Sequence, residues 1–452
     1  MMPDAPAGRT NRRPAADPAT TPLLALALAL ATAAIVAPAP ATAQGGGARA
    51  GLGPAIARHT PAITRLRHTI HQNPELSNRE TATAALVAEH LRELGLEVRT
   101  GVARTGVVGV LRGGRPGPVV AVRADMDALP VTEATGLPFA STKRATFNGQ
   151  EVGVMHACGH DIHVAVGLGV ASVLAERRAS LPGTVVFVFQ PAEEGPPAGE
   201  EGGAPLMLKE GVFADPRPEA ILALHAIPSL EVGQLGFTPG PAMAAADTWR
   251  AEIRGRQAHG AQPQESIDPV VMAAQAVMAL QTIRSRNMSA LDDGLVTVGI
   301  IRGGERHNII PGQVRLEGTV RTFDPAVQDL VERRMREILD GVTRAGGGSF
   351  TLEYDRGVPV TFNDIALGER LMPTLGRVAG ADAFRILPPT TGAEDFAFFA
   401  QEVPGFYFRL GTTKPGTTSG GLHTPTFTAD DSAIPVGIEA MTALVLAYLG
   451  GD

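Results

Sequence analysis

The chain has 452 residues, a formal net charge of -7 and few aromatic residues, which make up 4% of the sequence. This mild acidity provides no basic footprint for nucleic acid or for an anionic membrane, and so few aromatic side chains argue against platforms for base stacking. Apolar residues account for 44% and charged residues for 19%, which is typical of globular domains with sizeable cores.

The N-terminus has the features of a signal peptide. Arginine residues precede the apolar run Leu23–Ala37, and a helix of that length spans roughly 22 Å, less than the ~30 Å hydrocarbon core of a bilayer. An Ala-Thr-Ala sequence before Gln44 matches the small-residue pattern of a cleavage site. We therefore expect residues 1–43 to be removed, which leaves a periplasmic or secreted protein with no membrane segment; an uncleaved anchor is the alternative.

The segments 50–242 and 358–452 alternate helical patterns with continuous apolar runs. This alternation predicts an α/β catalytic domain with a helix-covered, mostly parallel sheet. Because sites in such sheets form beyond the carboxyl ends of the strands, we expect the polar residues that end the apolar runs to converge. These residues are Asp125 and Asp127 after the first run, Glu193 and Glu194 after the second, and His225 after the third.

The pattern changes between residues 243 and 357. Strands and helices follow the order β-α-β-β-α-β there, and the first helix has Asp268 as its N-cap and Pro269 in its first turn. This order is that of a ferredoxin-like α+β unit, so we expect an inserted lid or dimerisation domain. Its exposed sheet edges favour a homodimer.

The stretch from Met155 to His163, which reads MHACGHDIH, contains the only cysteine of the chain. One cysteine cannot form an internal disulfide, and taken alone Cys158 is most simply a buried, inert thiol. The flanking His156 and His160 favour a different interpretation, in which the thiolate binds a metal ion.

Six side chains offer the thiolate, imidazole and carboxylate groups that bind borderline divalent transition metals. They are Cys158, His160, Glu193, Glu194, His225 and His423. One zinc ion takes only three or four protein ligands, whereas two ions that share a bridging ligand use five and leave one residue free. If Glu194 binds metal, Glu193 can act as a general base, although an isolated Glu-Glu pair is ordinarily just solvated.

Eight motifs, in this order, resemble those of the M20 metallopeptidases: MHACGHDIH, FQPAEEG, ALHAIP, GRQAHGAQP, RHNIIPG, GTVRTF, GAEDFAFF and LHTPTF. The sequence is most similar to the amidohydrolase branch, which includes hippurate hydrolase, N-acyl amino acid aminoacylases and auxin-conjugate hydrolases. The resemblance extends from Ile63 to the C-terminal helix. It implies a two-domain fold and cleavage of the amide bond of N-acyl amino acids by metal-activated water. The alternatives are a carboxypeptidase or dipeptidase on the same scaffold, or a catalytically silent protein that binds metal or peptides.

The resemblance also implies roles for individual residues. It implies two divalent ions, zinc, manganese, cobalt or nickel, held by Cys158, His160, Glu194, His225 and His423. Glu193 matches the family's general base, and Asp127 matches an acid that orients a ligand. His259 matches the histidine that stabilises the oxyanion, and Asn308 and Arg321 match positions near the substrate's carboxylate.

Some positions depart from the family pattern. Asp125 stands where related branches have a metal-binding histidine, and His163 is a substitute ligand if the helix at this point begins early. The loop after the Glu-Glu pair is longer than usual and brings Glu200 and Glu201 near the site, where they would alter access or repel anionic substrates. Gln264 stands where this branch often has a histidine. These departures leave the preferred substrate open.

Overall fold

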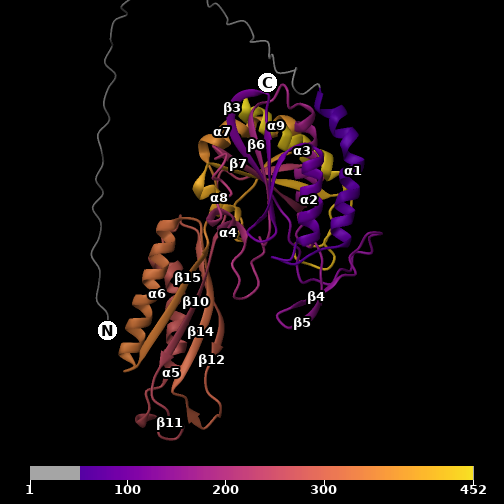
Figure 1. Ribbon diagram of the computed structural model, residues 1–452. Coiled ribbons are helices and arrows are strands. Elements are labelled where there is room, and N and C mark those ends of the chain that lie inside the picture. The colour runs from indigo at the N-terminus through magenta and orange to yellow at the C-terminus, as the bar shows by residue number, and fades with distance from the viewer. Residues whose placement is uncertain (1–50, 451–452) are drawn as a thin grey trace, which may run out of the picture. The chain divides into compact units, whose positions relative to one another are not determined.

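The computed structural model describes residues 51–450, so the predicted signal peptide lies outside the described residues. One part of the chain forms an eight-stranded sheet with the order β1-β2-β6-β3-β7-β18-β8-β17 (Figure 1). The central strands β6, β3, β7 and β18 are parallel, and β1, β2 and β8 each join their inner neighbour in an antiparallel pair. The strands are β1 (Glu97–Val102), β2 (Gly106–Arg112), β3 (Arg115–Asp125), β6 (Pro182–Gln190), β7 (Ala220–Glu231), β8 (Leu235–Phe237), β17 (Phe384–Ile386) and β18 (Gly405–Thr413).

Alternating side chains on the central strands build a hydrophobic core on each face of this sheet. In β6, Val185, Phe187 and Phe189 belong to one core, and Val186 and Val188 belong to the other. The first core is covered by α1 (Leu52–Gln72), α2 (Thr81–Glu93), α3 (His160–Glu176), α7 (Ile365–Ala379) and α9 (Ala433–Leu449), and the second by α4 (Gly203–Lys209) and α8 (Phe396–Glu402). The predicted α/β class with a helix-covered, mostly parallel sheet is therefore confirmed.

Helix α3 lies in the middle of the first core, which fixes the residues at its start. Every residue from His160 to Leu174 is buried, and the helix contacts α1, α9 and β3 (Figure 1). Gly169 allows the close approach of α9, because a Cβ atom there would lie 2.2 Å from Cδ1 of Ile438. The first turn of α3 is therefore held on several sides by packed neighbours.

A second, four-stranded antiparallel sheet has the order β12-β14-β10-β15. Its elements follow the predicted β-α-β-β-α-β order, and α5 and α6 pack on it around Trp249, Leu316 and Val331, in a core of their own. The elements are β10 (Ala245–Arg254), α5 (Pro269–Leu280), β12 (Gly294–Arg302), β14 (Gln313–Thr322), α6 (Pro325–Ala345) and β15 (Ser349–Val358). The ferredoxin-like prediction is confirmed as a fold, whereas the boundaries of the inserted domain stay a prediction.

Three two-stranded ribbons complete the sheet structure, and one joins the two parts of the fold. In that ribbon β9 (Gly240–Met243) pairs with β16 (Thr361–Asn363), directly before β10 and directly after β15. The chain therefore enters and leaves the four-stranded unit at neighbouring points. The other ribbons pair β4 (Arg144–Phe147) with β5 (Gln150–Gly153), and β11 (Ala258–His259) with β13 (Ile309–Ile310).

One strand boundary differs from the sequence-based expectation. His225 lies inside β7 and not at its end, because β18 pairs with β7 from Ile221 as far as Glu231. The apolar run ends earlier than the strand, since the pairing partner and not hydropathy determines where β7 stops. None of the helices within residues 51–450 combines the length and the hydropathy that a transmembrane segment requires.

Candidate metal centre

The MHACGHDIH motif forms a tight turn that leads into α3. Gly159 has a φ of 85°, and a Cβ atom there would lie 2.8 Å from Cβ of Ala226 in β7. Glycine is therefore required for conformation and for space, because the turn packs directly on the strand. As a result, Cys158 and His160 lie beside His225, although more than sixty residues separate them in the sequence.

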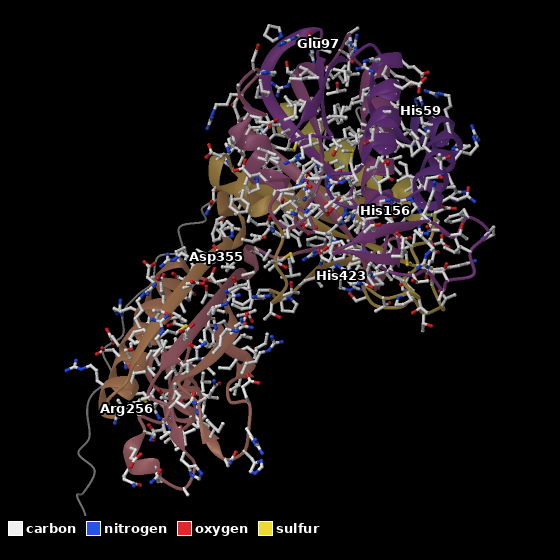
Figure 2. All side chains as sticks on the ribbon, turned by 60° about the horizontal axis from the view of Figure 1, so that its bottom comes forward. His59, Glu97, His156, Arg256, Asp355 and His423 are labelled. Carbon is white, nitrogen blue, oxygen red and sulfur yellow. The ribbon has the colours of Figure 1, made fainter. Side chains whose placement is uncertain are left out.

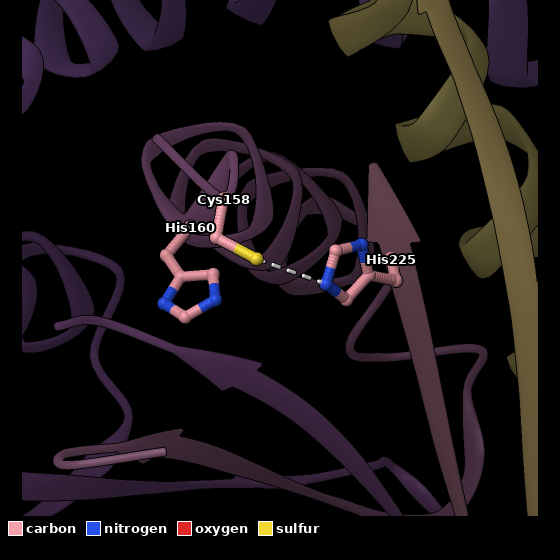
Figure 3. A group of neighbouring side chains, drawn as sticks. All are labelled: Cys158, His160 and His225. Carbon is pink, nitrogen blue, oxygen red and sulfur yellow. Dashed lines mark hydrogen bonds between the residues drawn. The ribbon is translucent and has the colours of Figure 1, made fainter. Parts of the chain in front are cut away.

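The cysteine sulfur is the common neighbour of two histidines. The Cys158 Sγ atom lies 3.4 Å from Nε2 of His225 and 3.2 Å from Nε2 of His423. Figure 3 shows the sulfur pointing toward the His225 ring, with the His160 ring beside it. The His423 Nε2 atom also lies 3.1 Å from Oε1 of Glu194, close but without the geometry of a hydrogen bond, so it lies near both the carboxylate and the thiol.

These side chains form three overlapping groups, each with ligand atoms within 4.8 Å of one another. The groups are Cys158, His160 and His225; Cys158, Glu194 and His423; and His160, Glu193 and Glu194. The structure thus brings together all five predicted ligands and the predicted base. Three members occur in two groups each, which is the arrangement that two adjacent ions with shared ligands require.

The histidine rings are oriented for metal binding. His160 Nδ1 lies 2.8 Å from the Asp127 carbonyl oxygen, and His225 Nδ1 lies 2.7 Å from the Ala226 carbonyl oxygen. A ring that donates its Nδ1–H to a carbonyl leaves the Nε2 lone pair for a metal ion. Burial, followed by the neighbouring His163 and Arg409, holds the pKa of His225 well below its usual value, so this ring is in the neutral form that binds metal.

The donor set fits divalent cations. His160 Nε2 and Glu194 Oε1 are buried without a hydrogen-bond partner, which is costly unless another group satisfies them. Burial raises the pKa of the Cys158 thiol to about 12, so the thiolate requires a nearby cation. Unsatisfied nitrogen and oxygen donors beside a buried sulfur suit zinc and similar transition ions better than magnesium or calcium.

Asp127 connects the Glu-Glu loop to the start of α3. Its carboxylate accepts hydrogen bonds from the backbone N–H groups of Glu193 and Glu194, at 3.1 and 3.0 Å, and from the Ser77 hydroxyl at 2.7 Å. Its own carbonyl oxygen faces His160, as described above. Asp127 therefore makes the contacts of an acid that orients ligands from behind, as the resemblance implies.

Asp125 and His163 form a further group of candidate ligands with His160, but both already have partners inside the protein. Asp125 forms a buried ion pair with Arg123 at 2.5 Å and lies 2.5 Å from His163 Nδ1. The other ring nitrogen of His163 accepts the backbone N–H of Ala226 at 2.8 Å. Both nitrogens of His163 are occupied, so the substitute-ligand interpretation loses its support, and Asp125 acts as the partner of Arg123 and His163.

Sequence reasoning missed a buried charge network centred on Arg123. Its guanidinium donates to Gln190 at 2.7 Å and to Glu394 at 2.9 Å, and it lies 3.2 Å from Asp395. Glu394 and Asp395 in turn lie in one group with Glu193. Burial, then the charge of Glu394, raises the pKa of Glu193 well above its usual value. An arginine inside the apolar run of β3 was the available signal, because a buried arginine must be paired.

A second buried network lies under the MHACGHDIH turn. Asp161 binds Arg67 at 2.8 Å and His71 at 2.9 Å, and His71 also lies 3.2 Å from Glu133. Burial alone lowers the pKa of His71, but the charge of Asp161 raises it to about 9. His156, labelled in Figure 2, is buried and has no hydrogen-bond partner for either ring nitrogen. His71, near the end of α1, is therefore a charged contact to the turn.

The three predicted substrate contacts lie on the four-stranded unit. His259 is exposed in β11, opposite Ile309 of β13, and the Gly260 N–H donates to the Asn308 carbonyl at 2.8 Å. Arg321 lies in β14 and donates to the Thr391 carbonyl at 3.3 Å. Within residues 51–450, none of these side chains belongs to a group of candidate metal ligands. The structure brings His259 and Asn308 together on one ribbon and does not join them to the metal ligands.

The long loop after Glu194 is fixed, and its charges are paired. Glu200 binds Arg79 at 2.6 Å, and Glu201 binds Lys209 at 2.8 Å. Both carboxylates therefore have cationic partners, and their effect on access or on anionic substrates stays a prediction. Gln264 is exposed in the short 3-10 helix Pro263–Glu265.

A helix-covered sheet with a thiol, three imidazoles and two carboxylates at its site defines a metal-dependent hydrolase. Residues 121–447 match the model of peptidase family M20/M25/M40. The N-acetyl-L-cysteine deacetylase of Bacillus subtilis is 39% identical over 82% of this chain and 84% of that protein. Thermostable carboxypeptidase 2 of Saccharolobus solfataricus is 36% identical over 85% of this chain and 95% of that protein.

A solved structure shows the same family relationship. The Bacillus subtilis YXEP protein, whose description is a dinuclear metal-binding peptidase from the M20 family, superposes with a TM-score of 0.73 and 33% identity, over 88% of this chain and 100% of that chain. The chain therefore belongs to peptidase family M20/M25/M40, as its motifs indicate. It is a metal-dependent amide hydrolase of the amidohydrolase and peptidase type.

Proposed function

We propose that this protein hydrolyses the amide bond of N-acyl amino acids with the help of two divalent metal ions. The observation that carries the proposal is a single carboxylate, that of Glu193, beside a cluster of five donors that can hold two ions. The deacetylase relative, whose name specifies an N-acetyl amino acid as substrate, supports this substrate class. The thiol favours zinc, and manganese, cobalt and nickel are the alternatives that metal analysis of the purified protein would distinguish.

The candidate residues would have two different roles: five would hold the ions, and one would move a proton. Cys158, His160, Glu194, His225 and His423 would hold the two ions. When bound, the ions would lower the pKa of a water molecule and polarise the scissile carbonyl. Glu193 lies 3.7 Å from His160 Nε2 and is the side chain that would take a proton from that water and pass it to the leaving nitrogen.

The four-stranded unit would contribute the substrate contacts. His259 would donate a hydrogen bond to the oxyanion, and Arg321 and Asn308 would bind the carboxylate of the amino acid. Because these residues do not contact the metal ligands, the proposal requires the unit to move toward the site when substrate binds.

Replacement of Glu193 tests the proposal. Glu193→Gln should retain two ions for each chain and lower kcat by about 10²–10⁴-fold, since the amide cannot accept the proton. Turnover is measured with a panel of N-acyl amino acids, and metal content is measured by elemental analysis of the same samples. Glu353→Gln, at an exposed position of β15, is the matched control and should leave both values unchanged. Near-normal turnover of Glu193→Gln would contradict the assignment of the base.

A carboxypeptidase or dipeptidase activity is the second candidate. The carboxypeptidase relative favours it, with 36% identity over most of both chains. The same panel, extended with dipeptides and with peptides that have blocked N-termini, separates the two. Faster cleavage of dipeptides with a free amino group than of acylated amino acids would favour the peptidase.

We also propose that the protein is exported and forms a homodimer. Export rests on the apolar run and the cleavage pattern in the sequence, and N-terminal sequencing of the mature protein would test it. The dimer rests on the four-stranded unit, where β12 is an edge strand and Val270, Val271 and Met278 of α5 are exposed. A monomer in sedimentation equilibrium at micromolar concentration would contradict it.

A further inference from the structure

A cavity of about 360 Å³ lies directly against Glu193. Ala192 and Glu193 belong to its lining, the loop and helix from 195 to 209 form most of its wall, and Val358 and Phe398 also line it. Glu193 also belongs to a metal-ligand group with His160. A molecular group in this cavity would therefore lie next to the proposed base.

The lining offers apolar contacts and no free cation. Pro196, Pro205, Leu206, Val358 and Phe398 provide its apolar surface. Lys209 also lines the cavity, but Glu201 pairs with its ammonium group at 2.8 Å. The cavity therefore has no unpaired positive charge for the carboxylate of an amino acid, and it suits an uncharged group.

Asp395 lines the cavity but is not available to bind an ammonium group. Its carboxylate accepts two contacts of 2.7 Å from the Gln190 amide, one of 2.8 Å from the Ala204 N–H, and one of 3.2 Å from Arg123. These donors satisfy its oxygens within the protein. Glu201, the remaining carboxylate of the lining, is paired with Lys209, so no carboxylate other than the base is left unpaired for the free amino group of a dipeptide.

The wall that the loop provides is fixed before any substrate arrives. Asn78 donates to the Glu200 carboxylate and to the Glu201 carbonyl, at 3.0 and 3.1 Å, in addition to the Arg79 ion pair. At the other end Gly203 has a φ of 66°, and a Cβ atom there would lie 2.6 Å from the Asp395 carboxylate. A preformed cavity can select its ligand by size.

We propose that this cavity binds the acyl group of the substrate and favours uncharged acyl groups of about six to eight carbon atoms over acetyl. The inference rests on the proposed function. A volume of about 360 Å³ far exceeds that of an acetyl group, so an acetyl group would leave most of the cavity filled with water. Each further methylene group that moves from water into the cavity should lower the Kd by about fourfold.

The first experiment is an acyl series on one amino acid: acetyl, butanoyl, hexanoyl and benzoyl. We expect kcat/KM to rise by at least about tenfold from acetyl to hexanoyl. Calorimetric titration of Glu193→Gln, which should bind without turnover, should give a Kd for the hexanoyl compound that is lower by a similar factor. A flat series in both measurements would overturn the proposal.

Variants of the cavity wall test its location. Val358→Trp fills the cavity and should reduce the preference for hexanoyl over acetyl by at least about tenfold. Val152→Trp, in the β4–β5 hairpin and outside the lining, is the control of equal size and should leave the preference as in the wild type. Phe398→Ala enlarges the cavity and should move the optimum to longer acyl groups, so it serves if Val358→Trp fails to fold.

The outcomes separate this inference from the function on which it rests. If the wild type cleaves no acylated amino acid, the proposed function fails and the inference fails with it. If it cleaves them but Val358→Trp and Phe398→Ala leave the acyl preference unchanged, only the acyl cavity is overturned. A preference for hexanoyl that both variants shift, in opposite directions, supports the proposal.

Discussion

Gly159 illustrates how a single residue positions two candidate ligands. The residue has a positive φ and packs against Ala226, so its neighbours Cys158 and His160 point toward His225. An alanine would need to adopt an unfavourable conformation and to displace β7 at the same point. The conformation of this turn thus determines the geometry of the metal ligands.

A pair of glycine variants separates conformational strain from displacement. Gly416→Ala has a similar φ of 77° with open space around it, so it should lower the free energy of unfolding by only about 1 kcal/mol. Gly159→Ala should lower it further and weaken metal binding by at least about tenfold, because the strand is displaced as well. Thermal unfolding and competition with a chelator measure the two effects. Equal metal affinity in both variants would refute this account of the turn.

At the scale of residues, the sequence predicted the functional side chains that lie within short motifs. Cys158, His160 and the two glutamates lie in such motifs, and the structure brings them together. The roles of Arg123 and Glu394 could not be predicted, because their importance comes from pairing across 271 positions of sequence. Such partners emerge only when strands and loops are placed in space.

Two strands of the larger sheet and the segment that precedes α8 are connected by buried charges. Arg123 of β3 binds Gln190 at the end of β6 and the acids that precede α8. Its side chain and that of Asp125 are fully buried, so each charge depends on its partners. Removal of the arginine would leave several acids uncompensated in the interior.

Replacement of two arginines measures this dependence. Arg123→Met should lower the free energy of unfolding by about 3–5 kcal/mol, because Asp125 and Glu394 lose their counterion. Arg112→Met in strand β2 is the control, since its ion pair with Glu97 is exposed and should contribute little. Urea denaturation of both variants provides the comparison. Similar small losses would show that the buried network does not stabilise the fold.

Helices and strands could be predicted from the sequence wherever the hydropathy pattern determines them. The apolar runs predicted the central strands, and the structure places those strands in the middle of the larger sheet. The end of β7 was not predictable, because pairing with β18 extends it to Glu231. Non-local pairing is the general reason why boundaries are harder to predict than elements.

On the scale of the whole molecule, the candidate ligands join distant segments. They come from the turn that leads into α3, the first residue of α3, the loop after β6, strand β7 and a C-terminal loop. Ions bound at this site would therefore cross-link parts of the chain that are far apart in sequence, and they would stabilise the folded state in proportion to their affinity.

Metal removal tests this coupling. The protein treated with a chelator should unfold at a lower temperature, since a free ion at 1,000 times its Kd contributes about 4 kcal/mol to the folded state. Readdition of zinc should restore the unfolding temperature, and magnesium, which prefers oxygen ligands, should not. Calorimetry with parallel metal analysis measures both. An unchanged unfolding temperature in protein shown to be free of metal would contradict the coupling.

The β9–β16 ribbon has a consequence for how the sequence of such a protein can change during evolution. Because Met243 and Thr361 pair directly, a chain that omitted everything between them could still close the same hairpin. The intervening segment can thus be exchanged or lost while the path of the large sheet stays intact. Such an exchange would leave the candidate metal ligands in place, because all of them lie outside this segment, but it would also replace Val358 in the lining of the cavity.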